Sequence, residues 1–136
     1  MLERTKITSF VYPAKVVRVV DGDTVSVELV LIDVDLGFNV NVRVPHVITL
    51  RLGGINAPET STDAGKVASV FLKTLLEPGT DCTVYTVKDR TEKYGRYLAW
   101  IHIDGDEFVN DIMVAKGHAI EYNPSNAKKP AIIANG

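Results

Sequence analysis

Residues 11–52 read VYPAKVVRVVDGDTVSVELVLIDVDLGFNVNVRVPHVITLRL, and this stretch decides the fold. Its valine-rich runs alternate with polar residues at the period of two that is typical of half-buried strands. Asp21-Gly22 and Gly37-Phe38-Asn39 interrupt these runs with turn residues. The pattern predicts three strands joined by two hairpins, with Pro45 at an edge or bulge because proline has no N–H to donate. The second hairpin has about ten or more residues per arm, against about five or six in a common strand.

The remaining chain predicts two helices and two further strands. A loop over residues 53–60 leads to a helix that begins at Ser61, Thr62 or Asp63, ends at Leu76 and precedes Pro78-Gly79. Its predicted core-facing stripe is Ala64, Val67, Ala68, Phe71, Leu72 and Leu75. Strands over 82–87 and 97–103 precede a short helix over 109–116 that Gly117 ends. This order predicts an α+β, mainly β, fold: a five-stranded OB-type barrel with one helix between strands 3 and 4 and a second short helix.

Length and composition favour a single domain that lacks a broad basic surface. The 136 residues suffice for one core, expected over 1–123, with a loosely ordered C-terminal tail over 124–136. The net charge is −2, from 15 basic and 17 acidic side chains. Proteins that coat nucleic acid are normally basic, so any polyanion must be bound by a local cluster of Arg and Lys. The single cysteine, Cys82, excludes an intramolecular disulfide and is expected to be buried.

The start of the chain carries Glu3, Arg4 and Lys6 and has no continuous apolar stretch. It does not read as a signal peptide, and no segment is long enough to span a bilayer. We therefore expect a cytoplasmic location and no membrane partner, or secretion if a leader has been removed.

Two carboxylates flank the first turn, in Asp21-Gly22-Asp23-Thr24. Asp-Gly between two valine-rich runs is in most proteins simply a tight turn. A turn does not require the second acid, Asp23, however. Paired carboxylates beside a turn supply the oxygens that calcium and magnesium prefer, so the motif is a candidate metal site.

Arg51 and Asn56-Ala57-Pro58-Glu59 are the next candidates. Strand alternation places Arg51 on the face opposite its two leucine neighbours, as either a solvated arginine or a planar donor fork for phosphate. The second motif is either a polar loop before a helix or part of a metal site. In the second case the Asn56 amide oxygen and the Ala57 carbonyl face the metal, and Glu59 directs a water as general base.

A basic loop, Lys93-Tyr94-Gly95-Arg96, opens the last long strand. Such a loop is either a solvated tip or a source of a second arginine, with Lys93 and Tyr94 against a nucleotide. His46, His102 and His118 form no pair at metal-binding spacing, which argues against a zinc enzyme. Walker, G-x-S-x-G and Rossmann motifs are absent from the sequence.

This ordered set resembles the staphylococcal nuclease (thermonuclease) family. The matching stretch, from Val16 to Ala119, contains Asp21-Gly22-Asp23-Thr24, Leu50-Arg51-Leu52, Pro58-Glu59-Thr60, Lys93-Tyr94-Gly95-Arg96, Leu98-Ala99, Val109-Asn110 and Gly117. The resemblance implies an OB-type barrel that hydrolyses phosphodiester bonds of DNA and RNA with calcium and leaves 3′-phosphate ends.

The resemblance also implies a role for each matched residue. Asp23 would ligate the metal directly, Ala57 through its carbonyl, and Asp21 directly or through a neighbour. Asn56 stands where the best-known member has an aspartate, so we expect weaker calcium binding, or a preference for Mg²⁺ or Mn²⁺. Glu59 would orient water, and Arg51 and Arg96 would clamp the phosphate. The expected nucleotide contacts are Lys93, Tyr94 and, with least support, Tyr122.

The long hairpin over 25–52 is a second departure from the best-known member. It is either a tolerated insertion, part of the substrate groove, or an arm for a partner or for a homo-oligomer. The main alternative to a nuclease is a non-catalytic module that binds nucleic acid or protein, because some domains of this family have lost their acids and arginines. The presence of Asp21, Asp23, Arg51, Glu59 and Arg96 together favours catalysis.

Overall fold

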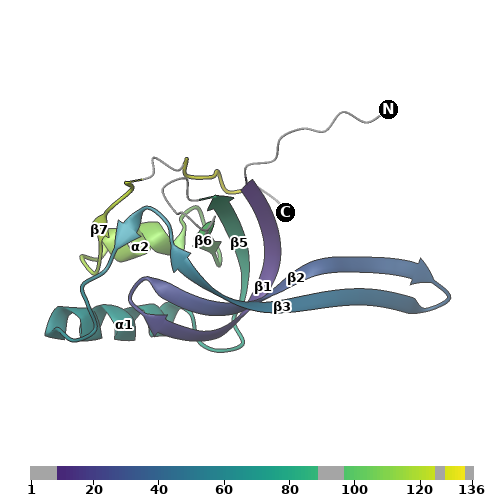
Figure 1. Ribbon diagram of the computed structural model, residues 1–136, viewed down its shortest axis with the longest axis horizontal. Coiled ribbons are helices and arrows are strands. Elements are labelled where there is room, and N and C mark those ends of the chain that lie inside the picture. Colours follow the sequence, from purple (N-terminus) through teal and green to yellow (C-terminus); the bar gives the residue numbers. More distant parts are fainter. Residues whose placement is uncertain (1–8, 89–96, 125–127, 134–136) are drawn as a thin grey trace.

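The computed structural model describes residues 9–88, 97–124 and 128–133, and most of its strands form a closed barrel (Figure 1). The barrel strands are β1 (Ser9–Asp21), β2 (Thr24–Gly37), β3 (Val40–Leu52), β5 (Asp81–Lys88) and β6 (Tyr97–His102), in the order β1-β2-β3-β6-β5. Among the strands that the structure describes, only β3 and β6 pair in parallel, with Arg51 opposite Leu98 and Leu52 opposite Ala99. The closed barrel confirms the predicted mainly β, OB-type fold.

The barrel interior holds the main hydrophobic core. Alternate residues of each strand point inward, and they include Val16, Val25, Val27, Leu50, Leu52, Val84, Ala99 and Ile101, all 4% exposed or less. A second cluster (Tyr85, Val87, Leu98, Trp100 and Phe108) contains the alternate residues of β5 and β6, and Ile132 packs against it. Cys82 is buried as predicted, and burial together with the charge of Asp81 raises the pKa of its thiol to about 11.

Helix α1 (Asp63–Leu75) begins where the sequence predicts. Thr62 is its N-cap, and the Thr62 hydroxyl accepts a hydrogen bond of 3.0 Å from the Gly65 N–H. The predicted core stripe is partly wrong, because Ala64 and Val67 are exposed and the buried face is instead Gly65, Ala68, Ser69 and Leu72. The reason lies at Gly65, where a Cβ would stand 1.8 Å from the Glu59 carbonyl oxygen. This backbone contact fixes the rotation of the helix.

The expected loop over residues 53–60 contains a short strand that the sequence did not reveal. This strand, β4 (Ile55–Asn56), pairs with β7 (Ile120–Glu121), which follows the second helix, α2 (Val109–Ala115). Two residues are too few to show a period of two, and the partner strand is far away along the chain. The pairing nevertheless matters, because it fixes the backbone of Asn56.

The β2–β3 hairpin projects far beyond the barrel, as Figure 1 shows. β1 accompanies β2 only as far as the Ala14–Leu29 pair, and β6 pairs only with the last two residues of β3. The register between β2 and β3 shifts just after the Val30–Pro45 pair, so Pro45 adjoins a bulge as predicted. The two arms have 14 and 13 residues, which confirms the predicted long hairpin.

Residues 128–133 contact helix α2 and strand β5. Lys129 forms an ion pair of 2.6 Å with Asp111, and the Ile133 N–H donates to the Tyr85 hydroxyl at 2.9 Å. Neither helix in the described part of the chain has the length and apolar character that crossing a bilayer requires.

Candidate active site

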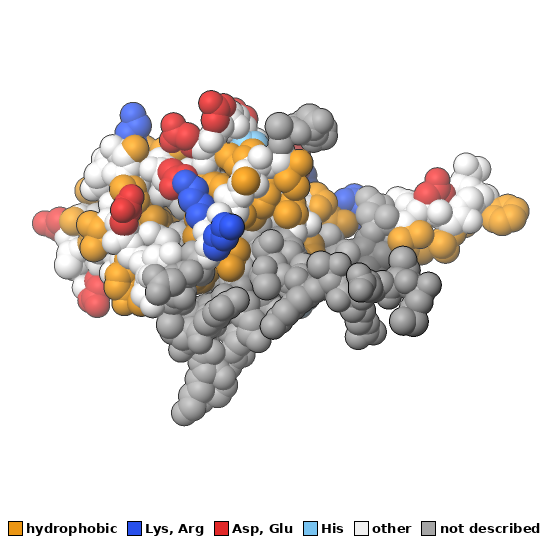
Figure 2. Space-filling model, turned by 90° about the horizontal axis from the view of Figure 1, so that it is seen from above, with side chains coloured by type: hydrophobic (Ala, Val, Ile, Leu, Met, Phe, Trp, Pro, Cys, Tyr) orange, Lys and Arg blue, Asp and Glu red, His pale blue; other side chains and the backbone are white. Residues whose placement is uncertain are grey.

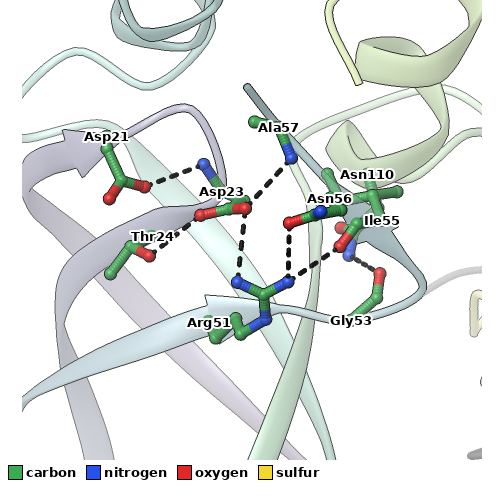
Figure 3. Close-up of polar contacts among 9 residues, drawn as sticks. All are labelled: Asp21, Asp23, Thr24, Arg51, Gly53, Ile55, Asn56, Ala57 and Asn110. Carbon is green, nitrogen blue, oxygen red and sulfur yellow. Dashed lines mark hydrogen bonds and ion pairs between the residues drawn. The ribbon is translucent and has the colours of Figure 1, made fainter. Parts of the chain in front are cut away.

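Three segments meet at one end of the barrel and bring polar groups together (Figure 3). The first is the turn between β1 and β2, which is shaped by its own side chains. The Asp21 carboxylate accepts a hydrogen bond of 3.1 Å from the Asp23 N–H, and the Thr24 hydroxyl donates to the Asp23 carboxylate at 3.2 Å. These contacts orient the Asp23 carboxylate toward the other two segments.

Arg51, near the end of β3, lies at the centre of the site. One terminal nitrogen of its guanidinium group, Nη1, donates to Asp23 Oδ2 at 3.3 Å. The other, Nη2, donates to Asn56 Oδ1 at 3.2 Å and to the Ile55 carbonyl at 3.3 Å. A cationic group is therefore held between the oxygen atoms of Asp23 and Asn56, as Figure 3 shows. The Arg51 side chain is 32% exposed, so one part of it faces solvent.

Asp23 also ties the turn to the loop after β4. Its Oδ2 atom accepts a second hydrogen bond, of 3.0 Å, from the Ala57 N–H. Asp23 is only 7% exposed, so these two donors replace water that the carboxylate has lost. The backbone of Ala57 is thus fixed directly beside the carboxylate.

The two aspartates have opposite pKa shifts. Burial raises the pKa of Asp23, and the nearby Asp21 charge adds to the effect, although the Ala57 N–H and Arg51 oppose it. Burial would also raise the pKa of Asp21, but hydrogen bonding with Asp23 and Thr24 and the Arg51 charge together lower it. The surroundings therefore favour the charged form of Asp21 and disfavour the charged form of Asp23.

Gly22 brings the turn and the loop into contact. A Cβ at this position would lie 2.8 Å from the Ala57 Cβ and 3.1 Å from the Ala68 Cβ. Gly22 is not among the glycines with a left-handed backbone, so close approach, rather than turn geometry, requires glycine here. The sequence showed only a turn signal at this position, because the contact joins segments far apart along the chain.

Asn110 holds in place the backbone segments next to the site. It is fully buried, and its side-chain nitrogen donates to the carbonyls of Gly53 at 2.8 Å and Ala99 at 2.9 Å. Its side-chain oxygen accepts from the Ile101 N–H at 3.1 Å. Asn110 thus links α2, β6 and the start of the loop that carries Asn56. The sequence shows Asn110 as part of a matching motif, but this positioning role depends on contacts between distant segments.

The structure brings together five of the predicted site residues: Asp21, Asp23, Arg51, Asn56 and Ala57. Glu59 lies on the same loop and is exposed, and its backbone carbonyl accepts a hydrogen bond of 2.7 Å from the Thr62 hydroxyl. Tyr122 is 48% exposed, and its N–H donates to the Gly54 carbonyl at 2.8 Å. Arg96, Lys93 and Tyr94 lie outside the described residues.

The donor set at this site fits a hard cation better than a zinc ion. Among the described residues, no three His, Cys, Asp or Glu side chains gather closely enough to hold a metal. Asp23 and Asn56, however, each direct an oxygen atom at the Arg51 guanidinium group, at 3.3 and 3.2 Å from its terminal nitrogens. Carboxylate, amide and carbonyl oxygens are the ligands that calcium prefers. A calcium-like ion and the Arg51 guanidinium would use the same oxygens.

A shallow cavity of about 200 Å³ adjoins this cluster. Its lining residues include Asn56, Ala57, His118 and Ile120. Phe71 stacks on His118 with the ring centroids 4.4 Å apart, which supports one wall of the cavity. The site therefore combines a charged cluster with an adjacent, mainly apolar hollow.

The fold and the site define a class: an OB-type barrel with a carboxylate, amide and guanidinium cluster at one end. The sequence profile of the family described as "Staphylococcal nuclease homologue" matches residues 49–134. The chain belongs to this family, which confirms the resemblance noted from the motifs.

Several curated relatives align with most of this chain. Endonuclease YhcR of Bacillus subtilis (strain 168) is 34% identical over 111 residues, which is 82% of this chain and 9% of that protein. An uncharacterized endonuclease of Escherichia coli O157:H7 is 31% identical over 112 residues, or 82% of this chain and 62% of that protein. An uncharacterized protein of Bacillus anthracis is 31% identical over 112 residues, which is 78% of this chain and 45% of that protein. The chain thus spans less than two thirds of the length of each of these relatives.

Proposed function

We propose that this chain is a divalent-metal-dependent nuclease that hydrolyses phosphodiester bonds of DNA, RNA or both and leaves 3′-phosphate ends. The observation that carries the proposal is the convergence of Asp23, Arg51 and Asn56. Family membership and two relatives named endonucleases support it. A phosphodiester carries a negative charge that increases in the transition state, so pre-placed cations stabilise that state more than the substrate.

The cation would be held by the oxygens of Asp23 and Asn56 and by the Ala57 carbonyl, with Asp21 fixing the turn. When bound there, a divalent ion supplies positive charge beside the phosphate and lowers the pKa of water. Calcium is our first proposal, with Mg²⁺ or Mn²⁺ as alternatives because Asn56 brings no charge.

Arg51 would act as the phosphate clamp. Its two terminal nitrogens already donate in a fork, to Asp23 on one side and to Asn56 and Ile55 on the other. A phosphodiester offers the same two-oxygen geometry, and its negative charge increases in the transition state. When Arg51 turns to the phosphate, it leaves the Asp23 and Asn56 oxygens available to a metal.

Glu59 would accept the proton of the attacking water. It lies two residues after Ala57, and the Thr62 cap and the Gly65 contact hold its backbone in place. Its exposure leaves the carboxylate accessible to water and substrate. Arg96 would supply a second guanidinium, at the leaving oxygen, and Lys93, Tyr94 and Tyr122 would contact the nucleotide.

The proposal is tested by incubating single-stranded DNA, duplex DNA and RNA with the protein in Ca²⁺, Mg²⁺, Mn²⁺ or chelator. We expect cleavage only with a divalent ion, and a large loss of rate in Glu59→Gln. Glu28→Gln is the matched control, because Glu28 is exposed on the barrel away from the site. Product ends should resist polymerase extension until a phosphatase removes the 3′-phosphate. Nucleic-acid binding without cleavage in every metal would instead identify a non-catalytic module.

A further inference from the structure

The part of the β2–β3 hairpin that leaves the barrel is a two-stranded ribbon that pairs with no other strand among the described residues. We define the ribbon as residues 30–47, where β2 and β3 pair only with each other. An isolated two-stranded ribbon is at best marginally stable in water, because too little apolar surface is buried. A ribbon of this length therefore gains stability when something covers it.

The register gives the ribbon two different faces. Val34 lies opposite Val42, and Val40 and Val44 lie two residues to either side of Val42, so these valines share one face. The same row continues along β3 to Leu50 in the barrel core. The apolar face of the ribbon is thus an extension of the inner face of the barrel, but the barrel does not cover it.

Exposure and composition distinguish this face from its reverse. The four valines (34, 40, 42 and 44) are 38–47% exposed, and they are followed at the tip by Leu36 at 58% and Phe38 at 98%. Figure 2 shows hydrophobic side chains at the end of the projection and along one of its sides. Toward the tip, the reverse face carries Arg43 and Asn41, opposite the positions of Asp33 and Asp35, whereas nearer the barrel it carries Val30, Pro45 and Val47. A contiguous exposed apolar patch with a polar reverse is typical of a protein interface.

The charge of the ribbon argues against nucleic acid as the partner that covers its valine face. The ribbon from Val30 to Val47 contains two aspartates and a single arginine, whereas arms that bind nucleic acid concentrate Lys and Arg. A second valine face with the same spacing and twist is the better complement. The four valines carry no charge, and His46, the next residue of the row, lies at the barrel end of the ribbon. Two copies can therefore meet over the valines without burying an unpaired charge.

We propose that the valine face of the ribbon binds the same face of a second copy of this chain, about a two-fold axis. Sheets pack face to face about 10 Å apart, which is compatible with valine side chains on both layers. The reverse faces, which carry Asn41 and Arg43, then remain in water. Such an isologous contact is the commonest symmetry of soluble dimers.

The area predicts how strong this dimer is. With about 3.3 Å per residue and strands about 4.8 Å apart, the face measures roughly 25 by 10 Å, which is about 250 Å² of flat area on each copy and about 500 Å² for the pair. Protruding side chains raise the accessible area above this figure, but it stays at or below the lower limit of about 1,000–1,200 Å² for specific interfaces. We therefore expect a weak dimer, with a dissociation constant of about 100 µM. The candidate active site, at the opposite end of β2 and β3, stays open in the dimer.

Sedimentation velocity from 1 to 200 µM tests the proposal. Wild-type protein should shift from the 14.9 kDa monomer toward twice that mass as its concentration rises. Val42→Lys should remain monomeric, whereas Asn41→Lys, with the same added charge on the reverse face, should dimerise like wild type. A bismaleimide cross-linker that spans about 10 Å should join two Val42→Cys chains into a covalent dimer, since the native Cys82 is buried. Thermal unfolding of each variant would show that the barrel itself is intact.

Three outcomes would overturn the dimer. They are a wild-type monomer at 200 µM, equal dimerisation of Val42→Lys and wild type, and dimer loss in Asn41→Lys alone. Co-sedimentation of a monomeric protein with phosphatidylcholine vesicles, abolished by Phe38→Ser, would assign the ribbon to a lipid surface instead. Nuclease activity per chain is measured in parallel. Because the ribbon is remote from Arg51, failure of the dimer and failure of the proposed function are seen separately.

Discussion

Asn56 sets the charge of the candidate metal site, and Asn56→Asp tests that role. Its Oδ1 atom lies 3.2 Å from the Arg51 nitrogen, so an aspartate would place one more negative charge directly in the cluster. Two unit charges 4 Å apart attract by about 1 kcal/mol in water, and the attraction is about twice as large for a divalent ion. The shorter metal–oxygen distance of about 2.3–2.6 Å strengthens it further. Stronger pairing of Arg51 with the new carboxylate opposes part of this gain.

The net expectation is calcium binding that is tighter by about 1.4–2.8 kcal/mol, or roughly 10- to 100-fold. Calorimetric titration of wild type and Asn56→Asp with calcium measures it. Asn41→Asp is the matched control, because it adds the same charge on the distant ribbon and should leave the affinity unchanged. Equal calcium affinity in wild type and Asn56→Asp would refute the idea that Asn56 contributes a metal ligand.

Three further predictions concern the groups that hold the site in place. Gly65→Ala should lower the melting temperature and the activity together, by about 1–3 kcal/mol in stability, because its Cβ would overlap the Glu59 carbonyl. Asn110→Ala should cost about 3 kcal/mol in chemical denaturation, since it leaves buried partners unpaired, whereas Asn41→Ala should cost less than about 0.5 kcal/mol. Because the Cys82 pKa rises from 9.0 to about 11 on folding, its contribution to stability is complete below pH 9. That contribution should be lost between pH 9 and 11, by up to about 1.4 kcal/mol per pH unit, and Cys82→Ala should lack this alkaline loss.

Local sequence patterns predicted most of the fold. The alternation from Val25 to Leu29 predicted a strand because one of its faces is buried, and the Thr62 cap and Pro78-Gly79 marked the ends of α1. Two errors share one cause, which is contact between distant segments. β4 was missed because its partner, β7, follows the second helix. The stripe of α1 was misplaced because Gly65 meets the Glu59 backbone, which no helical periodicity reveals.

The site was predictable as a set of residues but not as a network. Motif order identified Asp23, Arg51 and Asn56, because their chemistry suits a cation and a phosphate. The hydrogen bonds from Arg51 to both of the others depend on how β3 and β4 meet in three dimensions. The supporting roles of Gly22 and Asn110 depend on close packing across the barrel end, so the structure was needed to find them.

The central claim is that Arg51 stabilises a phosphodiester transition state at this site. Its most direct test is the ratio of kcat/KM for single-stranded DNA between wild type and Arg51→Ala in saturating calcium. Loss of a pre-placed donor costs about 3–4 kcal/mol, so we expect a loss of about a hundred- to a thousand-fold. Arg43→Ala, on the ribbon, should cleave at the wild-type rate. Equal cleavage by wild type and Arg51→Ala, or undiminished cleavage in chelator, would contradict the account.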